Sequence, residues 1–532
     1  MRRLLPPLSP PCSRSIRWSV ALLSLTVLPS QPLAGQTAAP LQSAAATITP
    51  ADIRQRIGII ADDSMLGRDT PSPGLEKTAQ YVADQFKHFG LKPGGENGGW
   101  FQRYTISRRR IDAAASHVGF MIHGKQARAD LTRDARYAFG LVPPGEVTAP
   151  AVLVGGAFTP DDIRHLDVRG KAVLLVMDYS KPLPSTALAM LQGLAAGGAA
   201  GIVTVSNRDS ATFARMVGAT PPTRTGVDGI NDGIPPVVEV HQRAIGEILT
   251  EAGVRPEEIR AAGTLVSMPL PDLTVGFGIK DEVLSSATAP NTVGILEGSD
   301  PALKNEYLVF SAHMDHVGVA GPNGTGGCTA RGADSICNGA DDDGSGTVGV
   351  IELAEAFTRQ GARPRRSVIF MTVSGEEKGL YGSSYFTEHP TIPLSQVVAD
   401  LNIDMIGRNW PDTIVAIGKE HSDLGQTLNR VAGQHKSLNM AAIDDRWPEE
   451  NFYFRSDHYN FARKGVPILF FFNGVHPDYH EVSDSPDKIN AEKMSRIVKL
   501  LFYLGQEVAN SPTRPRWNPK SYEKIVQKKP AA

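Results

Sequence analysis

The sequence predicts an α/β protein in which a mixed, mostly parallel sheet lies between layers of helices. The second half of the chain contains four nearly continuous apolar runs, "EYLVFSAH", "RSVIFMTVS", "VVADLNIDM" and "VPILFFF". Such runs are expected for strands that are buried on both faces. Helical stretches separate the runs, which is typical of βαβ units with right-handed crossovers.

Two helices are predicted near the start of this domain, in "ITPADIRQRIGIIADDSMLGR" and "GLEKTAQYVADQFKHFGLKP". The second has apolar residues at helical spacing, followed by a glycine and a proline that stop the helix. These residues are Ala79, Val82, Ala83, Phe86 and Phe89. We expect both helices to cover the sheet.

The segment from Gly145 to Asp281 reads as an inserted small α/β domain with its own core. Its expected strands are "APAVLVG", "KAVLLVMD" and "AAGIVTVS", and "PSTALAMLQGLAAGGAAG" supplies a helix that ends in glycines. The last residues, 511–532, form a basic, proline-rich tail that we expect on the surface or disordered.

Length and charge restrict the class of protein. The chain has 532 residues, which is enough for two or three domains with a large core. Its 54 basic and 56 acidic side chains leave a formal charge of −2. We therefore expect no overall field that attracts nucleic acid or anionic lipid.

The N-terminus has the pattern of a signal peptide over residues 1–38. Basic residues, including Arg14 and Arg17, precede the apolar run "WSVALLSLTVLP", which is too short to cross a bilayer, and small residues follow. We therefore expect an exported protein, periplasmic or extracellular, without a membrane span after processing. In such a protein Cys328 and Cys337, nine residues apart, are expected to form a local disulfide.

Polar side chains follow each of the four predicted strands. The first strand leads into His313 and Asp315, the second into Glu376 and Glu377, and the third into Asp404. The fourth is followed by two histidines, His476 and His480. Because ligands of open α/β sheets bind outside the carboxyl ends of the strands, we expect these side chains to converge.

Three consecutive aspartates, Asp341, Asp342 and Asp343, lie between the first strand and the next helix. Asp is an ordinary turn and helix-cap residue, but three repelling carboxylates together indicate a cation. Histidine with several carboxylates suits zinc, with manganese or cobalt as substitutes. The excess of carboxylates favours two ions that share one aspartate, although spacing alone does not say which.

Two adjacent glutamates suggest a division of roles. If one binds a metal, its neighbour points elsewhere and can take a proton from metal-bound water and give it to a leaving group. The pattern therefore predicts a hydrolase site.

These motifs resemble the co-catalytic di-zinc aminopeptidase family, which comprises bacterial leucyl aminopeptidases and the related zinc-dependent exopeptidases of the glutamate-carboxypeptidase type. The resemblance rests on "SAHMDHVG", "NGADDDGSG", "SGEEKGLYGS", "LNIDMIGR", "FRSDHYNF" and "YHEVSDSPDKI", in this order. It implies the zinc-exopeptidase fold, which is phosphorylase/hydrolase-like. The peptidase domain would be divided into residues 47–144 and 282–510 by the insertion.

The resemblance also implies roles for individual residues. One zinc ion would be bound by His313 and Asp404, and the other by Glu377 and His480. The middle aspartate, Asp342, would bridge them. The catalytic residues implied are the general base Glu376, the carboxylate Asp315 that orients His313, and the oxyanion-stabilising Tyr453. His316 and His476 receive no ligand role.

The insertion, residues 145–281, resembles the protease-associated domain in "LDVRGKAVLLV", "GLAAGGAAGIVTVSNRD" and "IPPVVEV". The function implied is an exported metallo-aminopeptidase that attacks the N-terminal peptide bond of a peptide with a metal-bridging water activated by Glu376.

Three alternatives remain open. A carboxypeptidase needs cationic side chains for the substrate carboxylate, and Arg331, Arg408 and Arg455 lie near the motifs. A glutaminyl cyclase of the same fold needs only one zinc ion. A receptor-like relative would lack the metal site. Nothing in the sequence points these arginines into the pocket, so the carboxypeptidase ranks second. The full ligand set argues against the cyclase and the receptor-like relative, and the aminopeptidase ranks first.

Overall fold

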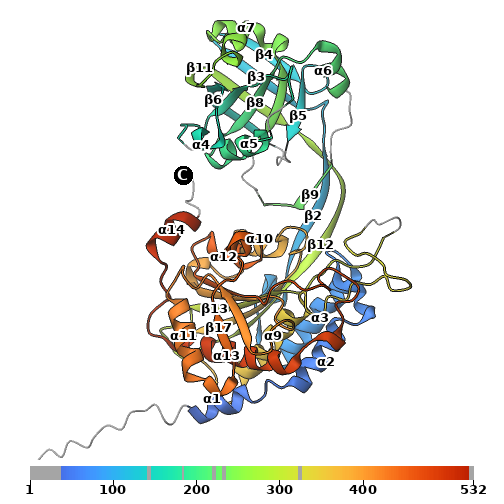
Figure 1. The fold of residues 1–532 in the computed structure, drawn as a ribbon, viewed down its shortest axis with the longest axis vertical. Coiled ribbons are helices and arrows are strands. Elements are labelled where there is room, and N and C mark those ends of the chain that lie inside the picture. Colours follow the sequence, from blue (N-terminus) through green and yellow to red (C-terminus); the bar gives the residue numbers. More distant parts are fainter. Residues whose placement is uncertain are drawn as a thin grey trace, which may run out of the picture.

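The computed structural model describes residues 38–139, 145–163, 165–182, 185–217, 223–230, 235–321 and 326–526 (Figure 1). The predicted signal peptide falls almost wholly on residues 1–37 and so lies outside the described residues. Within the described part of the chain, none of the helices has the length and apolar character needed to cross a membrane.

The first sheet has ten strands, and the four predicted strands form its centre. These are β13 (Tyr307–His313), β14 (Ser367–Val373), β15 (Val397–Ile403) and β18 (Ile468–Phe471). They run parallel in the order β18-β15-β13-β14. Nearly all of their residues are buried, as the apolar runs predict.

The flanks of this sheet are largely antiparallel, so "mostly parallel" describes its centre alone. On one side lie β16 (Thr413–Ile417) and β17 (Ala441–Ile443), and on the other β12 (Asp281–Leu296), β2 (Phe101–Ile111) and β9 (Thr223–Val227), with β1 (Lys92–Pro93) paired to β12. The sequence pattern missed β2 because "FQRYTISRRRI" is half-exposed and polar.

Helices cover both faces of the first sheet, as expected (Figure 1). One face packs against α2 (Pro50–Ile60), α3 (Pro73–His88), α9 (Gly344–Thr358), α11 (Leu424–Gln434) and α13 (Ala491–Asn510) in one large core. The other face packs against α10 (Tyr381–Glu388) and α12 (His458–Ala462) in a second core. A short helix, α1 (Ala38–Ala45), joins the larger core.

The first predicted helix is shorter than expected. It ends at Ile60, and a 3₁₀ segment follows over Asp63–Arg68. Leu66, Gly67 and Arg68 all have positive φ there, which an α-helix cannot contain.

The second sheet has eight strands in the order β4-β3-β11-β6-β7-β8-β10-β5. Their bounds are β3 His117–Ile122, β4 Lys125–Asp130, β5 Ala135–Phe139, β6 Gly145–Gly156, β7 Ala172–Val176, β8 Gly201–Ser206, β10 Val237–His241 and β11 Leu265–Ile279. The helices beside it are α4 (Pro160–Ile163), α5 (Ala187–Ala196), α6 (Ser210–Val217), α7 (Gly246–Glu251) and α8 (Pro256–Arg260). It has hydrophobic cores of its own.

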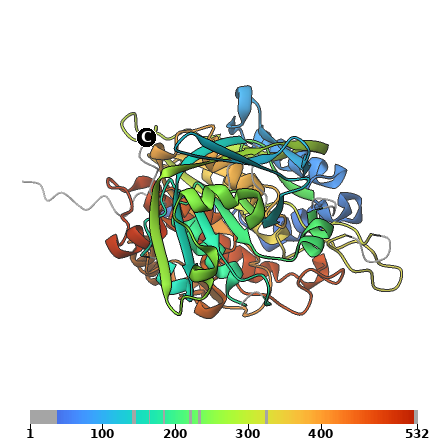
Figure 2. The same cartoon turned by 90° about the horizontal axis from the view of Figure 1, so that it is seen from above.

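This sheet reaches further toward the N-terminus than residue 145. The strands β3, β4 and β5 join it because β3 pairs with β11 and β5 with β10. Conversely, β9 lies within the range 145–281 but pairs with β2 of the first sheet. The long strands β2 and β12 connect the two parts of the molecule (Figures 1 and 2).

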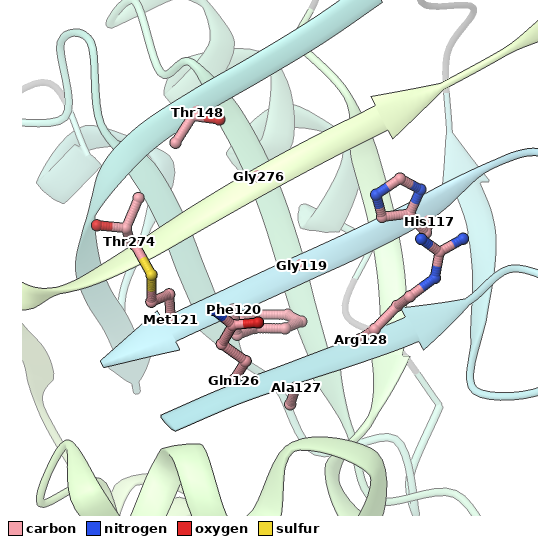
Figure 3. A pocket seen from close by; sticks show the side chains of 10 residues that line it. All are labelled: His117, Gly119, Phe120, Met121, Gln126, Ala127, Arg128, Thr148, Thr274 and Gly276. Atoms are coloured by element: carbon pink, nitrogen blue, oxygen red, sulfur yellow. The ribbon is translucent and has the colours of Figure 1, made fainter. Parts of the chain in front are cut away.

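An open cavity of about 410 Å³ lies on the second sheet (Figure 3). It is lined by residues of β3, β4, β6 and β11, among them His117, Met121 and Arg128. This cavity shares no residue with the strand ends that carry the predicted metal ligands.

Part of the tail is described, and it lies mostly on the surface, which was one of the two expectations. Residues 511–526 end in α14 (Pro519–Ile525), and Ile525 is buried in the core beside α12. The Trp517 indole N–H donates to the Gly465 carbonyl at 2.9 Å. The tail therefore packs onto the first sheet's layer of helices.

Candidate metal centre

The predicted site residues meet at one edge of the first sheet. β13 ends at His313, β15 is followed directly by Asp404, and Glu376 and Glu377 come just after β14. Because these strands are parallel, their carboxyl ends lie together. The loop after β18 adds His480, and the loop before α9 adds Asp342.

One group of ligand atoms comprises His313, Asp342 and Asp404. The Nε2 atom of His313 lies 3.4 Å from Oδ1 of Asp342 and 3.7 Å from Oδ1 of Asp404. All three side chains are buried. The spacing suits a cation between the imidazole and the two carboxylates.

A second group comprises His316, Asp342, Glu377 and His480. The Nε2 atom of His480 lies 3.2 Å from Oδ2 of Asp342 and 3.1 Å from Oε2 of Glu377. Asp342 therefore offers one oxygen to each group. The sequence resemblance proposed this sharing, and the geometry is compatible with it.

His316 belongs to the second group, although the sequence analysis gave it no ligand role. Its Nδ1 atom lies 2.9 Å from Oε1 of Glu377 and 3.6 Å from Oδ2 of Asp342. Its position three residues after His313, at the turn that leaves β13, was the signal available in the sequence.

The donor atoms fit divalent cations. Two of them, Asp342 Oδ2 and His480 Nε2, are buried and form no hydrogen bond. Buried polar atoms are normally satisfied, and buried carboxylates repel one another unless a cation neutralises them. Imidazole and carboxylate donors are the ligands that zinc takes in catalytic sites.

The three aspartates of the triplet have different partners. The Asp343 carboxylate caps α9 by accepting from the Gly346 N–H at 2.7 Å, and it also accepts from the Met405 N–H at 3.2 Å. The Asp341 carboxylate accepts from the Gly407 N–H at 2.6 Å. Asp342 alone faces the ligand groups, so one aspartate is available to the cations while its two neighbours hold the surrounding main chain.

His476 lies beside the triplet rather than among the ligands. Its Nε2 atom is 3.2 Å from Oδ2 of Asp341, and its Nδ1 atom accepts from the Asp478 N–H at 3.3 Å. Neither Nε2 of His476 nor Oδ2 of Asp341 forms a hydrogen bond, so the two side chains are close without a bond of this kind. This contact agrees with the expectation that His476 is not a ligand.

Glu376 is in neither ligand group, although it adjoins Glu377 in the chain. Burial raises the pKa of the Glu376 carboxyl well above its usual range. The charge of His313 opposes this shift, while Asp457, Glu377 and Asp404 add to it. A carboxyl with a raised pKa can exchange a proton near neutral pH.

Asp315 contacts the site differently from the expected role. Its carboxylate oxygen lies 3.7 Å from Nδ1 of His313, which is too long for a hydrogen bond. The Asp315 carbonyl oxygen lies closer, at 3.2 Å. The carboxylate instead accepts from the Thr70 hydroxyl at 3.0 Å and the Glu376 N–H at 3.3 Å.

The predicted oxyanion tyrosine, Tyr453, is buried, and the ligand carboxylates are not among the charges that shift its pKa. Its ring contacts His421 edge-on with centroids 4.5 Å apart, and its hydroxyl forms no hydrogen bond. Burial raises the pKa of Tyr453, followed by the charge of Glu420. The charged neighbours of this hydroxyl therefore differ from those around the two ligand groups.

Tyr479 lies beside the second ligand group and is 36% exposed, and the sequence analysis missed it. Its ring stacks on His480 with centroids 3.9 Å apart. Burial raises its pKa, followed by the charges of Asp342, Glu377, Glu376 and Asp404. The signal in the sequence was its place directly before His480 in "DYH".

The predicted disulfide is confirmed and lies next to the site. Cys328 and Cys337 are joined with an S–S distance of 2.09 Å, and Cys337 immediately precedes the "NGADDD" loop. The two cysteines pack with Val317 and Val482 in a small cluster. The disulfide closes a turn within the connection between β13 and α9, and it packs against Val482 from the loop that carries His480.

The fold and the ligand groups define a class: α/β proteins with a metal centre at the carboxyl edge of the sheet. Within this class, residues 291–505 match the model of Peptidase family M28. This part of the chain is therefore similar to Peptidase family M28. This match covers the four parallel strands and every residue of the two ligand groups.

Curated relatives agree with this family. Leupeptin-inactivating enzyme 1 of Streptomyces exfoliatus is 30% identical over 206 residues, which is 38% of this chain and 40% of that protein. Aminopeptidase YwaD of Bacillus subtilis (strain 168) is 24% identical over 249 residues, 45% of this chain and 49% of that protein. The chain thus spans about half the length of the curated relatives it matches.

Among solved structures, BSAP, a zinc aminopeptidase from Bacillus subtilis, is similar with a TM-score of 0.43 and 18% identity. The alignment covers 87% of this chain and 96% of that one.

Proposed function

We propose that this protein is an exported, zinc-dependent aminopeptidase with two ions at the edge of the first sheet. The observation that carries the proposal is the position of Asp342, which offers one carboxylate oxygen to each ligand group. A shared aspartate is the arrangement that a two-metal site requires. The names of the relatives, including several leucine aminopeptidases, favour the same activity.

In this proposal His313 and Asp404 hold one zinc ion, and Glu377 and His480 hold the other. His316 stands beside the second ion as a further ligand or as the partner of Glu377. Bound zinc would lower the pKa of water from 15.7 to about 7 and stabilise negative charge on a peptide carbonyl.

Glu376 is the proposed general base. Its raised pKa suits a carboxylate that takes a proton from the attacking water and later gives it to the leaving amine. The Asp315 carboxylate holds the Glu376 N–H at 3.3 Å and so fixes the start of this loop.

Tyr479, rather than Tyr453, is the proposed donor to the developing oxyanion. Its raised pKa keeps the phenol protonated, so that it can donate a hydrogen bond. Its ring stacks on His480, a member of the second ligand group.

The arginines near the site support an aminopeptidase over a carboxypeptidase. Each has a carboxylate partner: Arg331 with Glu481 at 3.1 Å, Arg408 with Asp478 at 2.9 Å and Arg455 with Glu450 at 3.6 Å. A carboxypeptidase would need a cation left free for the substrate carboxylate.

The test is an assay of the mature protein with leucine p-nitroanilide, its N-acetylated copy and an amine-blocked dipeptide that ends in glutamate. The apo protein is titrated with zinc in the same experiment. We expect release only from the free-amine substrate, restored as the second equivalent of zinc binds. Cleavage of the blocked dipeptide alone would indicate a carboxypeptidase. Inactivity with one bound zinc would favour a cyclase, and failure to bind zinc a receptor-like protein.

The inserted domain and the N-terminus carry two further proposals. The segment 145–281 is proposed to be a protease-associated domain that covers one side of the active site. The first 38 residues are proposed to direct export. Expression of the full chain in a bacterium with a periplasm, followed by N-terminal sequencing of the purified protein, would test the export, and an unprocessed N-terminus would contradict it.

A further inference from the structure

Arg68 is fully buried, although it carries a permanent charge. It lies more than 200 residues before the segment that matches Peptidase family M28. Its guanidinium forms hydrogen bonds to main-chain carbonyls rather than to a carboxylate. The acceptors are the carbonyl oxygens of Met314 at 2.9 Å, Ile60 at 3.1 Å, Gly339 at 2.8 Å, Asp342 at 3.4 Å and Asn338.

Four of these five acceptors lie in the loop after β13 and the loop before α9, at the two ends of one connection, and these loops present three of the six ligand residues. Met314 lies between His313 and Asp315, directly after β13. Asn338, Gly339 and Asp342 belong to the loop before α9. One rigid, planar guanidinium therefore fixes the distance between the main chains of the two loops. His313, His316 and Asp342 all project from these loops.

The charge of Arg68 also faces the acidic side of the site. Its electrostatic neighbours are Asp342, Asp484, Asp315 and Asp343. A buried cation at this point lowers the electrostatic repulsion among the clustered carboxylates. It does so even when no metal ion is bound.

The main-chain conformation around Arg68 places its side chain between the loops. The φ angles of Gly67 and Arg68 are 61° and 54°. A Cβ atom on Gly67 would lie 2.3 Å from the Gly318 carbonyl oxygen and 2.5 Å from that of Cys337, so only glycine fits. The Gly318 N–H donates to the Gly67 carbonyl at 3.0 Å, and the His316 N–H donates to the Arg68 carbonyl at 3.3 Å.

Thr70 extends the same set of contacts to the third loop. Its hydroxyl donates to the Asp315 carboxylate at 3.0 Å and accepts from the Gly375 N–H at 3.1 Å. Gly375 directly precedes Glu376 and Glu377. The hydroxyl thus joins the loop after β13 to the loop after β14, and both of its hydrogen bonds are buried.

We propose that Arg68 and Thr70 are positioning residues for the metal centre, which hold the three ligand loops at the separation that two ions require. The inference rests on the proposed function. It means that the segment before α3, which lies outside the matched residues 291–505, supports the metal site. Neither residue touches a metal ion or the substrate.

The test compares Arg68→Lys with Arg366→Lys in the full-length mature protein. Arg366 is also buried, and it pairs with Glu306 and with carbonyls near the end of α13, away from the ligand loops. Zinc stoichiometry and affinity are measured by competition with a chromophoric chelator, and folding by circular dichroism and thermal unfolding. Binding of two zinc ions by the wild type is established first, since a failure there rejects the proposed function rather than this inference.

We expect Arg68→Lys to weaken the binding of at least one zinc ion by about 10- to 100-fold. Replacing a residue that orients metal ligands typically costs this much affinity. Arg366→Lys is expected to lower the unfolding temperature without changing zinc affinity. Equal zinc affinity in Arg68→Lys and the wild type would overturn the role of Arg68.

Thr70→Val provides a second variant that removes a hydroxyl at nearly constant volume, and it keeps the inference testable if Arg68→Lys does not fold. Its matched control is Thr78→Val, because Thr78 is equally buried but donates only to the Gly74 carbonyl of α3 and the Met65 sulfur. We expect weaker zinc binding in Thr70→Val alone. Unchanged zinc affinity in Thr70→Val would overturn its role in holding the loops.

Discussion

The Nδ1 atom of His316 lies 2.9 Å from Oε1 of Glu377. This contact joins a residue that follows β13 to a residue that follows β14, and both side chains are buried. His316 also lies edge-on to His480, with ring centroids 5.5 Å apart. It is therefore in contact with two of the proposed ligands of one ion, and its removal should affect that ion more than the other.

Replacement of His316 by asparagine is expected to weaken zinc binding at the Glu377 and His480 site by about 10- to 100-fold. The His313 and Asp404 site should keep its affinity. Stepwise zinc titration by calorimetry would resolve the two events. The control is His241→Asn, which changes a buried histidine in the second sheet whose ring contacts the Arg208 carbonyl. Equal weakening of both sites would show that His316 supports the whole fold instead.

Replacement of Glu376 by glutamine should lower kcat by about 10²- to 10⁴-fold, because glutamine cannot take up a proton. Zinc stoichiometry should stay at that of the wild type, since Glu376 is in neither ligand group. Steady-state kinetics with leucine p-nitroanilide and metal analysis of the same sample measure both quantities. A variant that has lost zinc would place Glu376 among the ligands and refute its assignment as base.

We expect removal of the Tyr479 hydroxyl and of the Tyr453 hydroxyl to affect kcat differently. Tyr479→Phe removes a hydroxyl in the field of four site carboxylates and should lower kcat by about 10²- to 10³-fold, as the loss of an oxyanion donor does. Tyr453→Phe removes a hydroxyl that forms no hydrogen bond and should leave kcat within a few fold. If instead Tyr453→Phe is the slow variant, the sequence resemblance identified the donor correctly.

The sequence predicted the centre of the fold because the buried parallel strands are apolar throughout, as in "SVIFMTV". Polar residues directly after such strands can belong only to one edge of the sheet, which is why His313, Glu377 and Asp404 were found together. The antiparallel flank was missed because strands such as β2 are partly exposed and lack an apolar run.

The contacts that were missed depend on tertiary placement. Nothing in "LGRDT" indicates that the Arg68 guanidinium lies among carbonyls more than 240 residues away in sequence. Tyr479 and His316 are adjacent to motif residues, but only the fold shows which way their side chains point. Tyr453 matched a motif by spacing, whereas its hydroxyl lies among other neighbours.

Asp400 provides a prediction about pH and stability that does not depend on activity. It is fully buried in β15, and its carboxylate accepts one hydrogen bond, from the Ser311 hydroxyl at 2.7 Å. Burial raises the pKa of Asp400 to about 8, and the hydrogen bond from Ser311 and the charge of Asp457 act in opposite directions on it. In the unfolded chain the pKa of an aspartate is about 3.9.

Between these two pKa values the native state holds a proton on Asp400 that the unfolded state has lost. The free energy of unfolding therefore falls as pH rises through this window, by up to about 1.4 kcal/mol per pH unit from this group. Asp400→Asn keeps the shape of the protonated carboxyl and removes the dependence. The variant should gain stability relative to the wild type as pH increases from 5.5 to 8.5, when urea unfolding is compared at each pH. Asp84→Asn, on the exposed side of α3, serves as the control and should run parallel to the wild type. Parallel curves for Asp400→Asn and the wild type would mean that Asp400 is already ionised in the native protein.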